Sequence, residues 1–147
     1  MPKRFTINRS DRKIYENLRK AKKSPLKDMH NPDLFMLSMT LGLFFAKEGK
    51  ELDSHDQFIN DYNLSKEQRS IVDAIAVYKE QSLEVLIDED KVIKIAEEYA
   101  NAGLPILEKM AYCPDPKFIK FLEKELVDYF EKERLGSATS ENIINRA

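Results

Sequence analysis

The chain of 147 residues contains one cysteine, two histidines, four glycines and no tryptophan. A single cysteine, Cys113, excludes an intramolecular disulfide and is typical of a reducing compartment such as the cytoplasm. One thiol and two imidazoles, His30 and His55, are too few for a cysteine–histidine zinc site. The dispersed glycines exclude a glycine-rich phosphate-binding loop. The sequence therefore predicts a cytoplasmic protein without a metal or a cofactor.

Long apolar runs are also missing. The longest, residues 34–46, is interrupted by Ser38, Thr40 and Gly42 and is shorter than a membrane span. No apolar region follows the basic first residues, so they do not resemble a secretory signal. The length and the 42% hydrophobic content are sufficient for one domain with a buried core. We therefore expect no association with a membrane.

Positive charge is concentrated at the start of the chain. Residues 1–27 carry ten lysines and arginines against only Asp11 and Glu16, a local net charge of about +8. Because the whole chain has a net charge of −2, residues 28–147 carry about −10. Such asymmetry indicates a polyanionic partner, either a nucleic acid or an acidic protein. The predicted nucleic-acid-binding residues are Lys3, Arg4, Arg9, Arg12, Lys13, Arg19, Lys20, Lys22 and Lys23.

Two modes of binding remain open for this basic segment. In the first, its side chains contact DNA phosphates, which gives weak binding without sequence preference. In the second, the same charges dock on an acidic protein, and the chain is an adaptor or regulator with no direct DNA contact. No base-reading motif is present. The stretch from Arg4 to Leu18 resembles the entry of a ribbon-helix-helix domain, but the long helical body that follows is not typical of one.

Capping signals and apolar periodicity predict helices along most of the chain. The first helix begins at Ser10 or Asp11, and Pro25 indicates its end. Further helices are predicted at 31–48, in a short stretch opened by Ser54 around Phe58 and Ile59, at 65–78, from Asp88 onward, and from Asp115 onward. Gly103 and Pro105 predict a kink or a break in the helix that begins at Asp88.

These elements predict an all-α fold. We expect a single compact helical domain of five to seven helices over residues 1–135, followed by a loose tail at 136–147. Residues 4–8 alternate between polar and apolar side chains, which is typical of a short strand or of an extended arm. Residues 1–10 are accordingly predicted as a basic N-terminal arm.

The helix at 31–48 is predicted to be the central one, because it is apolar on nearly all sides. Leu37 and Phe44 are expected in the core on this basis. The last helix has more aromatic residues than one stripe requires, namely Phe118, Phe121, Tyr129 and Phe130. They are consistent with a homodimer or partner surface, and equally with a position in the core.

No arrangement typical of an enzyme is present, and we predict that the chain has no catalytic residue. Neither histidine lies in a motif with a serine or cysteine, as a nucleophilic triad requires. The alternative is a metal-dependent nuclease or hydrolase that uses Asp88, Asp90 and Glu98. Such a site requires carboxylates that converge from separate elements, whereas neighbouring residues on one helix point in different directions.

Two segments carry motifs of a known family. The first, Asn31–Gly42 with Lys47–Leu52, resembles the pattern D…LFM.A..LG…G.R…L of small proteins encoded beside DNA phosphorothioation (Dnd) systems. The second segment, Glu97–Leu107 with the sequence EEYANAGLPIL, is similar to the family's EEYANGGL.IL and is the more specific of the two. The chain departs from the second pattern at Ala102 and Pro105, and its basic leader is longer.

This resemblance, which covers roughly residues 12–130, implies a context more than a chemistry. Dnd systems replace a non-bridging phosphate oxygen of DNA with sulfur, and partner genes restrict unmodified DNA as antiviral defence. The resemblance implies a non-catalytic accessory protein of such a DNA-modification and antiviral-defence system. Its implied partners are DNA and other proteins of a defence complex.

Overall fold

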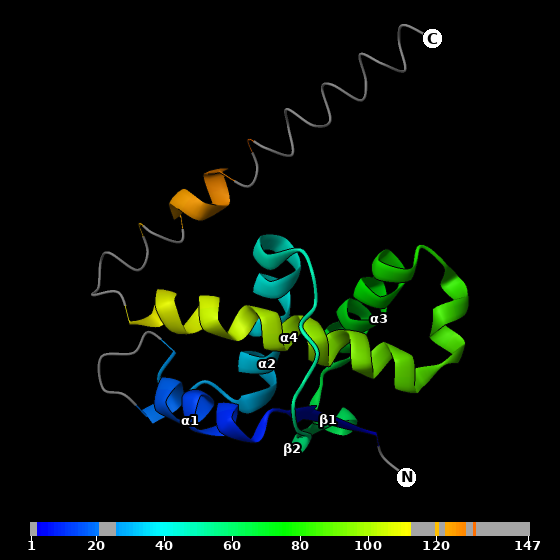
Figure 1. Cartoon of the computed structure of the whole chain (residues 1–147), viewed down its shortest axis with the longest axis horizontal. Coiled ribbons are helices and arrows are strands. Elements are labelled where there is room, and N and C mark those ends of the chain that lie inside the picture. Colours follow the sequence, from blue (N-terminus) through cyan, green and yellow to red (C-terminus); the bar gives the residue numbers. More distant parts are fainter. Residues whose placement is uncertain (1–2, 21–25, 113–119, 121–122, 129–130, 132–147) are drawn as a thin grey trace, which may run out of the picture.

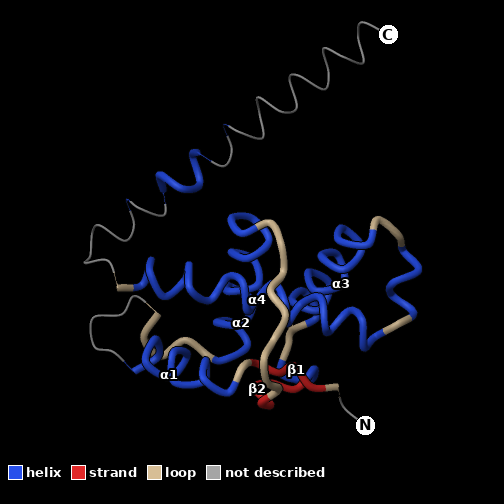
Figure 2. The backbone as a smooth tube through the Cα atoms, in the orientation of Figure 1, coloured by secondary structure: helices blue, strands red, loops and turns tan. Residues whose placement is uncertain are grey.

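The computed structural model describes residues 3–20, 26–112, 120, 123–128 and 131 (Figure 1). In chain order the elements are β1 (Arg4–Ile7), η1 (Arg9–Asp11), α1 (Arg12–Lys20), α2 (Asn31–Leu41), η2 (Gly42–Ala46), β2 (Asp56–Asn60), η3 (Asp61–Asn63), α3 (Lys66–Glu80), η4 (Leu83–Ile87) and α4 (Glu89–Ala111). The described part is mostly helical, as predicted, but Figure 2 shows that it also contains a small sheet of two strands. The all-α prediction is therefore correct only in outline.

The core lies where α2 packs against α4 (Figure 1). The buried residues of α2 are Leu34, Phe35, Met36, Ser38, Met39 and Leu41. They point to several sides of the helix, so α2 is covered nearly all round. This confirms the prediction of a central helix at this position. The helix continues as the π-helical turn η2 and ends at Ala46, and Lys47 follows in the left-handed conformation with φ of 66°.

Two glycines permit a close crossing of α2 and α4. A Cβ atom on Gly103 would lie 1.7 Å from the carbonyl oxygen of Ser38 and 2.5 Å from the amide nitrogen of Gly42. A Cβ atom on Gly42 would lie 1.9 Å from the carbonyl oxygen of Tyr99. Because any side chain at either position would collide with backbone, only glycine allows the two helices to approach this closely.

Of the kink or break predicted at Gly103 and Pro105, the break is wrong, because α4 is one helix of 23 residues with Pro105 inside it. Proline removes one hydrogen bond from a helix interior, but Leu104 and Leu107 on either side of it are each 1% exposed. Burial of this face stabilises the helix across the position of the proline. The ring of Pro105 itself is exposed. Tertiary packing therefore outweighs the local preference.

The predicted helix around Phe58 and Ile59 is also wrong, since these residues lie in β2. β2 pairs with β1 in antiparallel register, with Arg4 opposite Asn60 and Ile7 opposite Asp56. Of the two alternatives for the start of the chain, the described residues adopt the strand. Phe5 and Ile7 are only 3% and 4% exposed, so this segment is part of the core and not a free arm.

Two other helix starts are confirmed by their caps. Ser65 and Gln68 form a capping box at the start of α3, each side chain bonded to the other's backbone N–H. Asp88 accepts a hydrogen bond from the backbone N–H of Lys91 and caps α4. The 3₁₀ segment η4 (Leu83–Ile87) between these helices was not predicted.

Leu37 and Phe44 do not both occupy the core. Leu37 is half-buried against it, whereas Phe44 is 38% exposed in the middle of the π-helical turn. In the last predicted helix, residues 123–128 are helical, and Leu126 is 41% exposed. Cys113, the four aromatic residues of that helix and the predicted tail lie outside the described residues. Within the described part, no helix is both long and apolar enough to cross a bilayer.

Candidate nucleic-acid interface

Arg12, one of the nine predicted DNA-binding residues, is engaged within the fold. Its Nε lies 2.6 Å from Oδ2 of Asp56, and its Nη2 donates to the backbone carbonyl of Gln57. The Arg12 guanidinium holds the pKa of the Asp56 carboxyl below its usual value. These contacts fix the start of α1 to β2, so Arg12 has a structural role.

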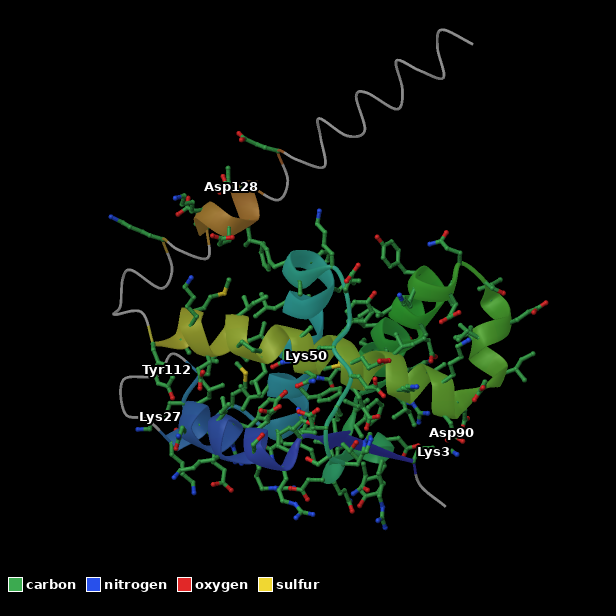
Figure 3. The ribbon with its side chains drawn as sticks, in the orientation of Figure 1. Lys3, Lys27, Lys50, Asp90, Tyr112 and Asp128 are labelled. Atoms are coloured by element: carbon green, nitrogen blue, oxygen red, sulfur yellow. The ribbon has the colours of Figure 1, made fainter. Side chains whose placement is uncertain are left out.

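Arg19 and Lys3 are engaged in the same way. Arg19 donates from Nε to the carbonyl of Met29 at 3.1 Å and from Nη1 to Oδ1 of Asn31 at 3.2 Å, which joins α1 to the start of α2. Nζ of Lys3 lies 2.9 Å from Oδ1 of Asp90, and Figure 3 shows the two residues side by side. The hydrogen bond and the charge of Asp90 raise the pKa of Lys3.

The remaining described members of the set are exposed. Arg4, Arg9, Lys13 and Lys20 form no ion pair with any other described residue. Lys13 and Lys20 lie seven residues apart on the exposed side of α1, a separation of about 10 Å, and Arg9 lies about one turn earlier. We call Arg9, Lys13 and Lys20 the basic face. Lys22 and Lys23 lie outside the described residues.

The alternative carboxylate site is not assembled in the described part of the chain. Asp88 caps α4, Asp90 pairs with Lys3, and Glu98 follows Asp88 by ten residues, about 15 Å along the same helix. Among the described residues, no group of three or more histidine, cysteine or acidic side chains is placed to hold a metal ion.

A polar cluster that the sequence did not indicate connects β1 with α4. Oε2 of Glu97 accepts hydrogen bonds from the backbone N–H and the hydroxyl of Thr6, both at 2.5 Å. Nδ1 of His55 lies 2.9 Å from Oγ1 of Thr6. Because the single hydroxyl proton of Thr6 points to Glu97, Nδ1 of His55 is the donor in this second hydrogen bond, and Oγ1 of Thr6 is the acceptor. Glu97 is only 7% exposed, and its burial raises its pKa.

The order of these groups differs from that of a nucleophilic triad. In a triad the imidazole lies between the hydroxyl and the carboxylate and removes the hydroxyl proton. Here the Thr6 hydroxyl lies between Glu97 and His55, and the imidazole donates to it. The cluster therefore holds β1 against α4, and nothing in this order points to a nucleophile.

Asn101 makes a second connection one turn further along α4. Its Nδ2 donates to the carbonyls of Lys50 and Glu51 at 3.0 and 3.2 Å, and its Oδ1 accepts from Nδ2 of Asn8. Oδ1 of Asn8 in turn accepts from the backbone N–H of Asp53 at 2.7 Å. Two asparagines thus join the end of β1, the loop before β2 and α4.

The chain matches the model of a known protein family. A family model described as DNA sulphur modification system-associated protein 4 matches residues 4–133. The chain belongs to this family. Membership confirms the resemblance to Dnd-associated proteins and connects the chain with a DNA sulphur modification system. Neither a curated protein nor a solved structure matches the chain.

The segment that carried the resemblance supports the fold in this member of the DNA sulphur modification system-associated protein 4 family. Within Glu97–Leu107, Glu97 binds β1, Asn101 binds the loop before β2, and Gly103 allows the contact with α2. The segment is therefore the place where three distant parts of the chain meet.

Replacing Glu97 by glutamine is expected to change how stability depends on pH. Glutamine retains an oxygen that accepts from both Thr6 donors, but it cannot ionise. Burial raises the pKa of Glu97 above its ordinary value of 4.5, so the folded protein binds this proton more tightly than the unfolded chain. Wild type should therefore gain stability relative to Glu97→Gln as the pH falls from neutral toward that value. Urea denaturation between about pH 5 and pH 8 measures the difference.

The alanine variant separates the hydrogen bonds from the charge. Glu97→Ala leaves both Thr6 donors without their acceptor and should cost about 1–3 kcal/mol across this pH range. Parallel stability profiles of wild type and Glu97→Gln would show that folding does not raise the pKa of Glu97.

Proposed function

We propose that the chain is a non-catalytic accessory protein of a DNA sulphur modification system with a role in antiviral defence, and that it associates with duplex DNA and with partner proteins. The observation that carries the proposal is the basic face: Arg9, Lys13 and Lys20 are exposed, while Lys3, Arg12 and Arg19 are engaged within the fold. The chain belongs to a family associated with a DNA sulphur modification system, and this supports DNA as the polyanion that the basic face binds.

The fold presents these cations on a fixed surface. Phe5, Tyr15 and Leu18, from β1 and α1, are at most 3% exposed and anchor the segment to the core. Lysine and arginine on one helix face reach phosphates but no defined set of base edges, so binding has no sequence preference. The net charge of about −10 on residues 28–147 opposes approach by other faces. We expect dissociation constants on the order of micromolar or weaker near physiological salt.

The double variant Lys13→Glu/Lys20→Glu is expected to weaken DNA binding and to reduce its dependence on salt. Each phosphate contact contributes about −0.9 to the slope of log affinity against log salt concentration, so the loss of two contacts should flatten the slope by nearly 2. Fluorescence anisotropy with a labelled duplex over a salt series measures both quantities. The duplex is used with and without phosphorothioate linkages, which carry the same charge and should bind alike.

A matched control reverses the same charge elsewhere. Lys66 and Lys79 lie at opposite ends of α3 and are exposed, so Lys66→Glu/Lys79→Glu changes the net charge equally but leaves the basic face intact. Equal loss of DNA affinity in both variants would mean that the net charge of the protein, and not the basic face, determines binding. If wild type binds no DNA while Lys13→Glu/Lys20→Glu abolishes capture of a partner protein, the chain is an adaptor instead.

A further inference from the structure

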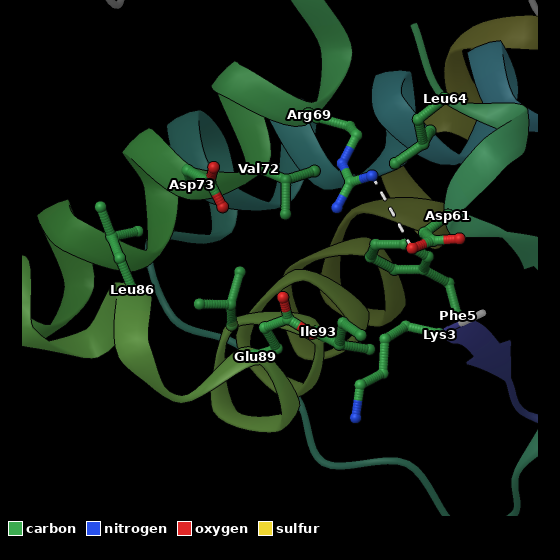
Figure 4. Close-up of a pocket in the computed structure, with 11 residues that line it drawn as sticks. Lys3, Phe5, Asp61, Leu64, Arg69, Val72, Asp73, Leu86, Glu89 and Ile93 are labelled. Carbon is green, nitrogen blue, oxygen red and sulfur yellow. Dashed lines mark ion pairs between the residues drawn. The ribbon is translucent and has the colours of Figure 1, made fainter. Parts of the chain in front are cut away.

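A second surface lies around the junction of α3, η4 and α4. A pocket of about 120 Å³ opens there, and Figure 4 shows side chains from β1, α3 and α4 around it. Its apolar lining includes Phe5 and Val72, which are 3% and 4% exposed, together with Leu86 and Ile93. This floor is suited to an aliphatic or aromatic group and not to a free ion.

At the rim of this pocket the two basic side chains form ion pairs, whereas two of the acidic side chains form none with the described residues. Lys3 is bound to Asp90, and Nη1 of Arg69 lies 3.7 Å from Oδ2 of Asp61. Asp73 on α3 and Glu89 on α4 are exposed, and neither forms an ion pair with another described residue. In Figure 4 the two carboxylates come from different helices on opposite sides of the opening. Two unpaired negative charges therefore flank an apolar floor.

An exposed apolar surface adjoins the pocket. Leu83, Leu86 and Ile87 of η4 are 73%, 40% and 86% exposed, and Leu86 also lines the pocket. Exposed acidic residues surround them in the chain, namely Glu84, Asp88, Glu89 and Asp90. Large apolar side chains that are grouped on a surface and rimmed by charge are typical of a protein-interaction site.

We propose that this surface binds a basic, partly apolar segment of a partner protein, with an arginine side chain in the pocket. The methylene stem of arginine would lie on Val72, Leu86 and Ile93, and its guanidinium would pair with Asp73 and Glu89. Apolar residues of the same segment would cover Leu83 and Ile87. The surface rejects nucleic acid, because its unpaired charges are negative. It is distinct from the basic face, so it does not depend on DNA binding.

The first experiment uses agmatine, a four-carbon stem with a guanidinium at one end and an ammonium at the other, with the isotope-labelled full chain. We expect saturable NMR shifts at the methyl groups of Val72, Leu86 and Ile93. Shifts should be weaker with guanidinium ion, which lacks the stem, and with 1,4-diaminobutane, which lacks the guanidinium. Asp73→Asn/Glu89→Gln should weaken agmatine binding at least tenfold. The control Glu16→Gln/Glu67→Gln removes two exposed acids away from the pocket and should leave it unchanged. Shifts spread over all acidic surfaces, or insensitive to the pocket variant, would overturn the proposal.

The second experiment tests the adjoining surface with a synthetic peptide of arginine and leucine, and with a matched peptide that has glutamate for arginine. Leu83→Ser/Ile87→Ser should weaken binding of the arginine peptide severalfold but leave agmatine binding intact. The glutamate peptide should not bind. If both peptides bind alike, the site has no preference for a basic partner. Asp73→Asn/Glu89→Gln should not weaken DNA binding, so failure of this proposal is distinguishable from failure of the basic face.

Discussion

Gly103→Ala should destabilise the protein by about 3 kcal/mol, the reverse of what this substitution does in an open helix. In an exposed helix interior, alanine is favoured over glycine by about 1 kcal/mol. At Gly103, however, the new Cβ would lie 1.7 Å from the carbonyl oxygen of Ser38. The obstacle is backbone, which cannot change rotamer, so α2 and α4 must separate and lose packing along their contact. Chemical denaturation of the variant and wild type gives the difference directly.

The reciprocal position provides an internal check. A Cβ on Gly42 would meet the carbonyl oxygen of Tyr99 at 1.9 Å, so Gly42→Ala should be destabilising by a similar amount. Once one substitution has separated the helices, the second should cost less, and the double variant should lose less stability than the sum of the two. A Gly103→Ala variant more stable than wild type would mean that the helices do not cross this closely.

Phe35→Ala should cost about 3–5 kcal/mol, as expected for removal of a fully buried aromatic ring. Phe35 is 0% exposed on the central helix. Its ring packs against that of Phe5 in an edge-on arrangement with centroids 5.3 Å apart. The substitution therefore leaves a cavity between α2 and β1 and removes one of the contacts that hold the strand on the core. Urea denaturation measures the loss.

Phe44→Ala is the matched control, with the same change in side chain on the same continuous segment. Because Phe44 is 38% exposed, we expect less than half of the loss seen at Phe35. The sequence placed Phe44 in the core, since it is apolar and helically spaced. Equal losses at the two positions would restore that prediction and contradict the structure.

Helix starts could be predicted where the deciding contact is local. The side chains of Ser65 and Gln68 bind backbone three residues away, so a short pattern contains the whole interaction. The same capping pattern at Ser54–Gln57 predicted a helix that does not form. The conformation of residues 56–60 is determined by pairing with β1, which lies about fifty residues earlier in the chain. A local capping pattern favours a helix, and pairing with a distant strand favours a strand. The tertiary structure determines which of the two conformations a segment adopts.

The basic residues illustrate the same limit at the candidate site. Sequence identified a cluster of cations, but it did not distinguish Arg12 from Lys13. Arg12 meets Asp56, 44 residues later, whereas Lys13 points to the exposed side of α1. No local pattern indicates that Glu97 is buried, because its partner Thr6 is 91 residues away. Long-range partners therefore decide which charges are available for binding.

The position of β1 has a consequence for synthesis of the protein. The contacts that hold this strand come from residues translated later, among them Phe35, then Ile59 in β2, and then Glu97. On the ribosome, β1 therefore lacks its full set of partners until Glu97, in the first half of α4, has emerged. A polypeptide released before residue 56 would carry β1 without its partner strand and with its apolar side chains exposed. Prematurely terminated chains of this protein should consequently be substrates for chaperones and proteases.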